Sequence, residues 1–159
     1  MIIETTERAI AFNPFEEAVG RYEITDFSHN FKSLIIYLSL KDETKDVRLV
    51  VSFLDHIIPK LTNESYRGWY HVRFKQIYEE VGKFYPVVLV KNSRFMKELS
   101  EESYEITDMV DFKHYIVEDT EWTFDVASQS SPKVELFVDG VLTKTAEPKR
   151  HAMFTKQNK

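Results

Sequence analysis

The stretch KHYIVEDTEWTFDVAS, residues 113–128, decides how the fold of this chain is predicted. Two runs of alternating apolar residues, 114–117 and 122–126, flank the acidic tetrapeptide at residues 118–121. Alternation with a period of two is typical of strands, and two such runs joined by a short polar segment predict a β-hairpin. We therefore expect a hairpin whose tip presents three carboxylates and whose two arms each carry an aromatic residue.

Two further hairpins follow from the same pattern on either side of this stretch. Residues 31–40 and 47–54 alternate in polarity around the charged segment KDETKD, which predicts a second antiparallel pair. Towards the end of the chain, Asp139 and Gly140 form the dipeptide most typical of a tight type I′ turn between two strands. The chain is therefore expected to be rich in antiparallel strands.

Helices are expected between these strands. The Asn-Pro dipeptide at positions 13–14, followed by acidic and apolar residues, is typical of a helix start, and Gly20 is placed to end that helix. Apolar residues at helical spacing over 72–81 predict a second helix, and the alternative is a strand over residues 69–74 followed by a short helix. Ser93 is placed to cap a third helix over residues 94–99.

The remaining segments complete the expected fold class. Residues 55–62 contain a proline and are expected to form a short helix or an irregular crossing. Strands are expected over residues 21–25 and 85–90, and an edge strand over residues 104–110. Together these elements predict an α+β fold, in which a mainly antiparallel sheet has two to four helices packed on one face.

Length and composition indicate a single domain that folds without a cross-link. A chain of 159 residues buries about two-thirds of the surface that its unfolded form exposes. Apolar residues make up 43%, and only 4 glycines and 5 prolines are present, which argues against disordered linkers. We expect one domain over residues 1–148, followed by a mobile basic tail over residues 149–159.

The chain contains no cysteine, which excludes disulfides, thiolate metal sites and thiol nucleophiles. This composition fits a reducing compartment. The N-terminal segment is acidic where a signal peptide would be basic, and no apolar run approaches the roughly 20 residues of a spanning helix. We therefore expect a cytoplasmic protein with no membrane contact.

The net charge of −5 disfavours binding to nucleic acids and to anionic membranes. Basic and aromatic side chains alternate over residues 67–75, a pattern seen in platforms for single-stranded nucleic acids. The same pattern fits a strand whose bulky side chains pack inward while its basic side chains face water. Because the acidic total opposes phosphate binding, we favour the strand and expect no nucleic-acid partner.

No motif in the chain identifies a reaction. None of the 5 histidines is paired at the spacing of three or four that metal ligands often show, and adjacent carboxylates are typical of solvated faces. Motifs for a serine nucleophile, a phosphate loop or a dinucleotide are absent from the sequence. The protein is expected to be non-enzymatic, without metal or cofactor. An enzyme that uses Tyr70, His71 and Asp55 is an alternative that no spacing favours.

Acidic residues between positions 101 and 121, opposed only by Lys113, form the candidate partner-binding surface. Carboxylates can steer a cationic partner towards such a surface, and aromatic side chains can supply anchoring area. The alternative interpretation of the hairpin tip is an ordinary charged turn without any partner. The predicted partner-binding residues are Glu101, Glu102, Glu105, Asp108, Asp111, Tyr115, Glu118, Asp119, Glu121 and Trp122.

Four segments between residues 33 and 136 carry a resemblance to a known class of proteins. They are the first hairpin, NESYRGWY at 63–70, VVLVKNSRF at 87–95 and HYIVEDTEWTFDVAS at 114–128. In these segments the chain resembles the small bacterial immunity proteins encoded beside secreted polymorphic toxins. The resemblance implies a small cytosolic α+β fold, an acidic inhibitory face and no chemistry of its own, and it assigns no functional residue.

These observations lead to two functional hypotheses of different kinds. In the first, the protein is a stoichiometric inhibitor that docks a basic partner protein through residues 101–121 and occludes its active site, with a salt-sensitive association rate. In the alternative, it is a phage or mobile-element accessory protein, or an assembly subunit, that acts by homo-oligomerisation through exposed strand edges. That alternative predicts an obligate homodimer whose mass does not depend on salt.

Overall fold

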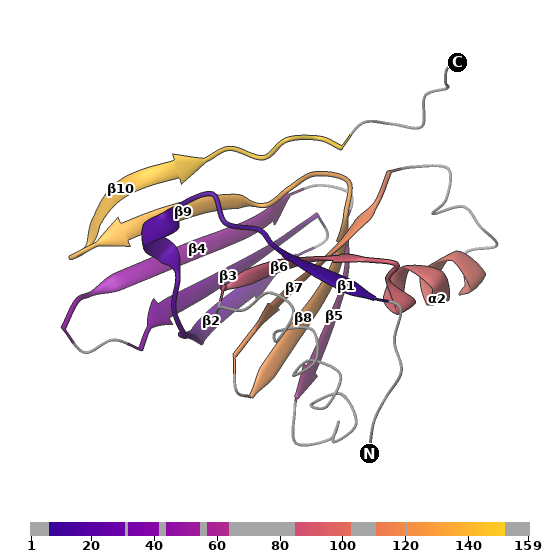
Figure 1. Ribbon diagram of the computed structural model, residues 1–159, viewed down its shortest axis with the longest axis horizontal. Coiled ribbons are helices and arrows are strands. Elements are labelled where there is room, and N and C mark those ends of the chain that lie inside the picture. The colour runs from indigo at the N-terminus through magenta and orange to yellow at the C-terminus, as the bar shows by residue number, and fades with distance from the viewer. Residues whose placement is uncertain are drawn as a thin grey trace.

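A computed structural model of the chain describes residues 7–30, 32–41, 44–54, 57–63, 85–102, 111–119 and 121–151. Within these ranges the protein consists mainly of antiparallel strands in two five-stranded sheets, with one α-helix and one 3-10 turn (Figure 1). The expected α+β fold with two to four helices on one face is therefore wrong. The described residues form a mostly β structure in which two sheets, rather than a sheet and a helical layer, enclose the core.

The strands of the first sheet come from both halves of the chain. The turn between residues 118 and 123 joins two neighbouring strands and confirms the predicted hairpin. In order across the sheet, the strands are β1 (Arg8–Ala11), β6 (Val87–Lys91), β7 (Lys113–Glu118), β8 (Trp122–Ser128) and β5 (Ile57–Asn63).

The second sheet contains the other two predicted hairpins. One is confirmed by the pairing of Ser33 with Leu54, and the other by its turn, where Asp139 and Gly140 have φ angles of 50° and 79° as a type I′ turn requires. In order across the sheet, the strands are β10 (Val141–Ala146), β9 (Lys133–Val138), β4 (Val47–Leu54), β3 (Ser33–Leu40) and β2 (Tyr22–His29).

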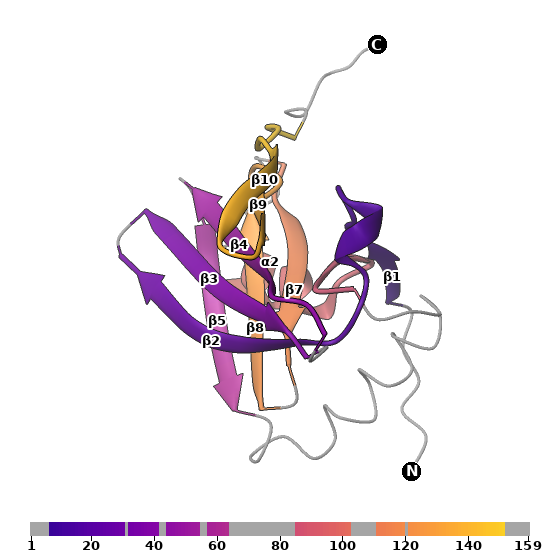
Figure 2. The same cartoon turned by 90° about the vertical axis from the view of Figure 1, so that its left-hand side faces the viewer.

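The chain crosses between the two sheets from β4 to β5 and again from β8 to β9. Because β4 pairs with β9 and β5 pairs with β8, one two-stranded ribbon runs from the second sheet into the first. Figure 2 shows the strands β2 to β4 running obliquely across β7 and β8. Alternate residues of both sheets point into the space between them, and Leu49, Phe53, Phe124 and Val126 are among those buried there.

The helix expected after residues 13–14 is only a 3-10 turn, η1 (Glu16–Ala18). Phe15 stands before the turn and makes no side-chain cap, so the asparagine of the Asn-Pro dipeptide does not start the element. Phe15 and Ala18 are both buried in the core. A helix this short is marginal in water, so the burial of these two side chains determines the path of the segment.

The expectation of a short helix or irregular crossing over residues 55–62 is also wrong for the part that the structure describes. Residues Ile57–Asn63 form strand β5, in which Pro59 lies opposite Val126. Because β5 is an edge strand, the missing N–H of Pro59 need not interrupt the sheet. Strand β1 at the other edge was not predicted at all.

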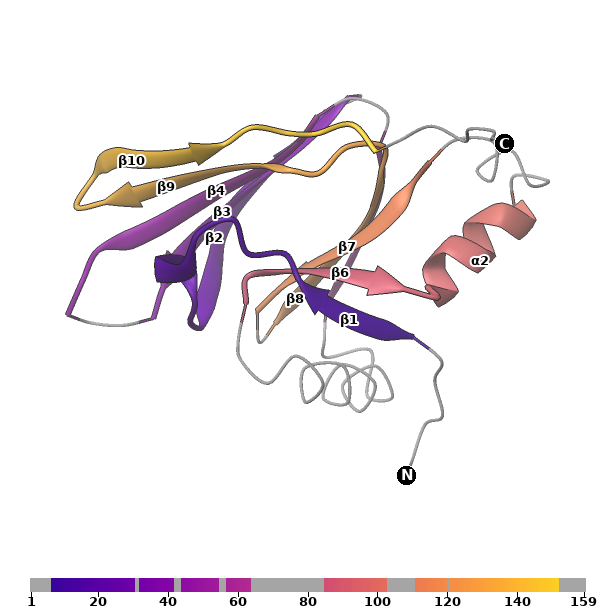
Figure 3. The ribbon, with the colours of Figure 1, turned by 45° about the horizontal axis from the view of Figure 1, so that its top comes forward.

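The helix predicted after Ser93 is confirmed as α2 (Arg94–Glu102). The Ser93 Oγ accepts the backbone N–H of Met96 at 3.0 Å, which is the expected N-cap bond. Figure 3 shows that the helix follows directly from the end of β6, at the side of the first sheet. Phe95 is buried, and its ring lies 4.9 Å from the imidazole of His114 on β7.

The predicted basic tail begins with residues that pair with the rest of the protein. Arg150 forms a β-bridge with Ser130, and the N–H of His151 donates to the carbonyl of Gln129 at 2.8 Å. Pairing thus extends three residues past the expected domain boundary at 148. The predicted helix over 72–81, the predicted edge strand over 104–110 and residues 152–159 lie outside the described residues.

Candidate functional site

The predicted acidic surface is not one continuous patch. Glu101 and Glu102 are exposed at the end of α2, whereas the other described acidic residues of the set lie on or beside β7 and its turn. Figures 1 and 3 both show α2 well away from the turn between β7 and β8. Glu105 and Asp108 lie outside the described residues. The structure therefore separates the acidic residues of the helix from those of the hairpin tip.

Tyr115 lies in the core rather than on the surface. Only 2% of it is exposed, and its ring packs against those of Phe12 and Phe53, each with a centroid separation of 5.7 Å. Its hydroxyl bonds the Nε2 of His151 at 2.8 Å, and half-buried Asp111 accepts from His151 Nδ1 through its backbone carbonyl. Burial, and secondly the charge of Asp111, raise the pKa of Tyr115. Tyr115 therefore cannot serve as an exposed anchor.

Asp119 holds the hairpin tip in place through both of its carboxylate oxygens. Its Oδ1 accepts the backbone N–H groups of Glu121 at 2.8 Å and Trp122 at 2.7 Å, which closes the turn. Its Oδ2 accepts the N–H of Ile24, on the edge strand β2 of the second sheet, at 2.9 Å. The tip of a hairpin from one sheet is therefore bonded to the edge of the other.

This bond brings together acidic residues from two distant parts of the chain. Glu23 and Asp26 are exposed on β2, on either side of the Ile24 N–H that Asp119 accepts, and Glu121 is exposed in the turn. We call Glu23, Asp26, Asp119 and Glu121 the acidic margin. Sequence reasoning missed its β2 half because two scattered carboxylates carry no local signal. The other predicted residues here, Glu118 and Trp122, are half-buried.

Two large apolar side chains are exposed close to this margin. Phe27 on β2 is 44% exposed, and its ring packs edge-on against that of buried Phe124 at 5.2 Å. Leu61 on β5 is 38% exposed and lies directly opposite Phe124 in the strand register. We call Phe27 and Leu61 the apolar pair. The two residues flank the same core side chain, from the edge strands of the two different sheets.

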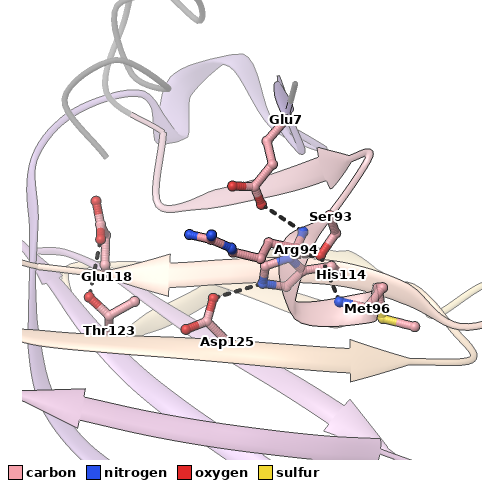
Figure 4. A network of polar contacts seen from close by, with 8 residues as sticks. All are labelled: Glu7, Ser93, Arg94, Met96, His114, Glu118, Thr123 and Asp125. Carbon is pink, nitrogen blue, oxygen red and sulfur yellow. Dashed lines mark hydrogen bonds and ion pairs between the residues drawn. The ribbon is translucent and has the colours of Figure 1, made fainter. Parts of the chain in front are cut away.

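A second candidate site is a buried chain of hydrogen bonds between α2 and the first sheet (Figure 4). The Nδ1 of His114 lies 2.7 Å from the Ser93 Oγ, and its Nε2 lies 2.7 Å from the Asp125 Oδ1. His114 and Asp125 have no exposed surface. A neutral imidazole that carries its proton on Nε2 satisfies the chain, because it donates to Asp125 and accepts the Ser93 hydroxyl.

Serine, histidine and a carboxylate in this sequence are the components of a nucleophilic relay. A nucleophile must reach its substrate, however, and Ser93 is only 6% exposed. Its oxygen already accepts the N–H of Met96, and the buried carboxylate of Glu7 accepts the N–H of Arg94 at 3.1 Å at the same end of α2. These hydrogen bonds run from Ser93, which caps α2, to His114 on β7 and Asp125 on β8, so the buried chain connects the helix to the first sheet.

The signal for this buried chain was present in the sequence. The alternating pattern of β8 puts Phe124 and Val126 on one face, so Asp125 falls on the other, and His114 occupies a similar position near the start of β7. Polar residues in the middle of strands that are buried on both faces must find hydrogen-bond partners inside the protein. The spacing between the histidines does not indicate this role of His114.

The described residues contain no group of three or more histidine or acidic side chains that could hold a metal ion. Among them, no helix has the length and apolar character needed to cross a membrane. Comparisons of the chain with protein-family models, with curated proteins and with solved structures found no match. The resemblance to immunity proteins therefore depends on the quoted segments alone.

Proposed function

We propose that the protein is a non-enzymatic, cytoplasmic binding module that docks a basic protein through the acidic margin, as an immunity protein inhibits a toxin. The observation that carries this proposal is the bond from the Ile24 N–H to the Asp119 carboxylate at 2.9 Å. It joins the hairpin tip to β2, so that Glu121 is held at the same margin as Glu23 and Asp26. Carboxylates grouped in this way attract a cationic surface and speed its encounter.

The fixed geometry of the tip favours binding over a purely solvating role. Both oxygens of Asp119 accept backbone N–H groups, so the turn needs no ordering when a partner arrives. A surface that is already ordered loses less conformational entropy on association. If the partner is a toxin that binds phosphates, the exposed carboxylates of the margin can occupy the positions of substrate phosphates in its active site.

The homo-oligomeric alternative has less support, because each edge strand of the two sheets has a feature that disfavours pairing. β1 is only four residues long, and β5 contains Pro59 and Lys60. β2 and β10 are each interrupted by a register shift. An assembly subunit acting through strand edges would need at least one long, regular edge.

An enzymatic role is also disfavoured by the burial of the Ser93–His114–Asp125 chain. Ser93 is only 6% exposed, and its hydroxyl oxygen already caps α2, so a substrate has little access to it in the folded protein. We therefore propose that the Ser93–His114–Asp125 hydrogen bonds stabilise the fold and that the acidic margin carries the function.

The proposal is tested with the product of the adjacent gene as the candidate basic partner. Binding kinetics are measured at low and high salt for the wild type and for a variant carrying Asp26→Lys and Glu121→Lys. We expect the association rate to fall about tenfold in this variant and in high salt. The control carries Glu101→Lys and Glu102→Lys on α2, with the same charge change, and should keep a rate within about twofold of the wild type. Equal losses in both variants, or no binding by the wild type, would contradict the proposal.

A further inference from the structure

We infer that the acidic margin takes a basic segment presenting one large apolar side chain, which packs against the exposed surfaces of Phe27 and Leu61. This inference rests on the proposed function and specifies the chemistry of the partner. It follows from the position of the apolar pair at the side where the edge strands β2 and β5 leave the core partly open to water.

The apolar pair belongs to the inner faces of the two sheets. Phe27 lies opposite Ile36, which is 0% exposed, and Leu61 lies opposite Phe124, which is 2% exposed. Cross-strand partners project from the same face of a sheet, so Phe27 and Leu61 both face inward. Their exposure of 44% and 38% shows that the core is not fully covered at this side.

Carboxylate oxygens lie along the edge of β2, next to the backbone of Phe27. Asp26 precedes Phe27, and its Oδ1 accepts the Phe27 N–H at 2.8 Å. The N–H of Ile24, three residues before Phe27, is held by Asp119 from the hairpin tip. A segment that buries an apolar side chain against Phe27 therefore brings its neighbouring residues close to negative charge, and lysine or arginine is favoured at those positions.

The occupant binds through its side chains and does not add a strand to β2. The Ile24 N–H is already bonded to Asp119, and the register of β2 shifts between Ile24 and Asp26. Both features interrupt the regular row of backbone groups that strand addition requires. A second copy of this chain is disfavoured as the occupant, because its net charge of −5 opposes the margin.

Two synthetic peptides test the inference on the full chain. Both are rich in lysine and of equal length, and they differ only at the central residue, which is tryptophan in one and serine in the other. Fluorescence anisotropy with labelled peptides gives their affinities for the protein. We expect the tryptophan peptide to bind about tenfold more tightly, since burial of an aromatic side chain carries much of the affinity at an interface.

A variant with Phe27→Ser and Leu61→Ser should bind the two peptides within about twofold of each other. The control is Val141→Ser with Leu142→Ser, which removes two exposed apolar residues from β10 at the opposite edge of the second sheet and should keep the tenfold preference. Phe27→Leu retains an apolar side chain and serves as a milder variant, which should keep most of the preference.

The outcomes separate this inference from the proposal on which it rests. If the wild type binds both lysine peptides equally, the apolar pair does not receive an apolar side chain, while the proposed docking at the acidic margin stands. If the wild type binds neither peptide, both are wrong. If the β10 control loses the preference as fully as the Phe27 and Leu61 variant does, the site that binds the tryptophan is not at the apolar pair.

Discussion

The carboxylate of Asp119 accepts the backbone N–H of Ile24 at 2.9 Å, although the two residues are 95 positions apart in the chain. The same carboxylate closes the turn between β7 and β8 through two further backbone N–H groups. One side chain therefore shapes the hairpin tip and attaches it to the other sheet. A residue that resembles a surface charge in the sequence is a structural link between two sheets.

Replacing Asp119 should destabilise the protein more than an exposed acidic residue would. Asp119→Ala removes three hydrogen bonds to a charged acceptor, and we expect the free energy of unfolding to fall by about 2–3 kcal/mol. The neighbouring substitution Glu121→Ala is the control and should stay within about 0.5 kcal/mol of the wild type. Urea denaturation measures both. A loss for Asp119→Ala no larger than that of the control would mean that the tip is not held by this carboxylate.

Removing the central residue of the buried Ser93–His114–Asp125 hydrogen-bond chain should strongly lower the free energy of unfolding. His114→Ala removes the partner that bonds both the Asp125 carboxylate and the Ser93 hydroxyl, and we expect a loss of about 3–5 kcal/mol in unfolding free energy. Ser93→Ala removes the helix cap and should cost about 1–2 kcal/mol. The exposed residue His29 provides the matched control, because His29→Ala should change stability by less than about 0.5 kcal/mol. Similar denaturation midpoints for His114→Ala and His29→Ala would contradict this account.

The Ser93 hydroxyl should be unreactive as a nucleophile in the folded protein. A fluorophosphonate probe labels serines that are activated by a neighbouring base and open to solvent. Because Ser93 is buried and caps α2, the wild type and Ser93→Ala should be labelled to the same low extent. Labelling that disappears in Ser93→Ala would show a reactive nucleophile and would overturn the non-enzymatic proposal.

The partial burial of the His151 imidazole, which bonds the Tyr115 hydroxyl, should make stability depend on pH. Burial lowers the pKa of His151 from its ordinary value of 6.5, against the opposing effect of its bond to the Asp111 carbonyl. The unfolded chain therefore binds a proton at His151 before the folded protein does, so stability falls as the pH drops through about 6.5. Denaturation at several pH values should show the advantage of the wild type over His151→Gln shrinking as the pH falls. An advantage that grows towards acid pH would mean that the charged imidazole is the favoured form.

Two buried tyrosines should respond in opposite ways to loss of the hydroxyl. Burial raises the pKa of Tyr22 to about 12, and its hydroxyl has no hydrogen-bond partner among the described residues. Tyr22→Phe should therefore raise the free energy of unfolding by about 1 kcal/mol, because it removes an unsatisfied polar group. Tyr115→Phe loses the bond to His151 and should lower it by about 1 kcal/mol. Thermal or urea denaturation distinguishes the two, and equal losses would contradict the assignment of Tyr22.

Local features of the chain were predictable where local chemistry decides them. The strands around the KDETKD segment and around the acidic tetrapeptide follow from alternation of polarity. The turn at Asp139 and Gly140 follows from positive φ angles that few other residues adopt readily, and the cap at Ser93 from a hydroxyl placed before a helical pattern. Each of these depends on residues close together in the sequence.

The number of sheets and the secondary structure of two short segments could not be predicted from neighbouring residues. Residues 57–63 form a strand because β8 pairs with them, and residues 16–18 remain a single 3-10 turn because Phe15 and Ala18 enter the core. Short apolar runs fit a helix or a strand equally well until a partner is present. Because pairing between distant segments decides these elements, the protein forms two sheets rather than the expected α+β fold.

For the candidate site, the sequence by itself determined that the β7–β8 turn is acidic and that the chain carries a net negative charge. Only the tertiary structure decided that Tyr115 is buried and that Asp119 is bonded to Ile24, which puts the β2 strand that carries Glu23 and Asp26 against the hairpin tip. The physical reason is that alternation orders side chains along one strand, whereas the packing of one sheet on the other chooses which distant residues meet. A surface shared by two sheets is a property of that packing.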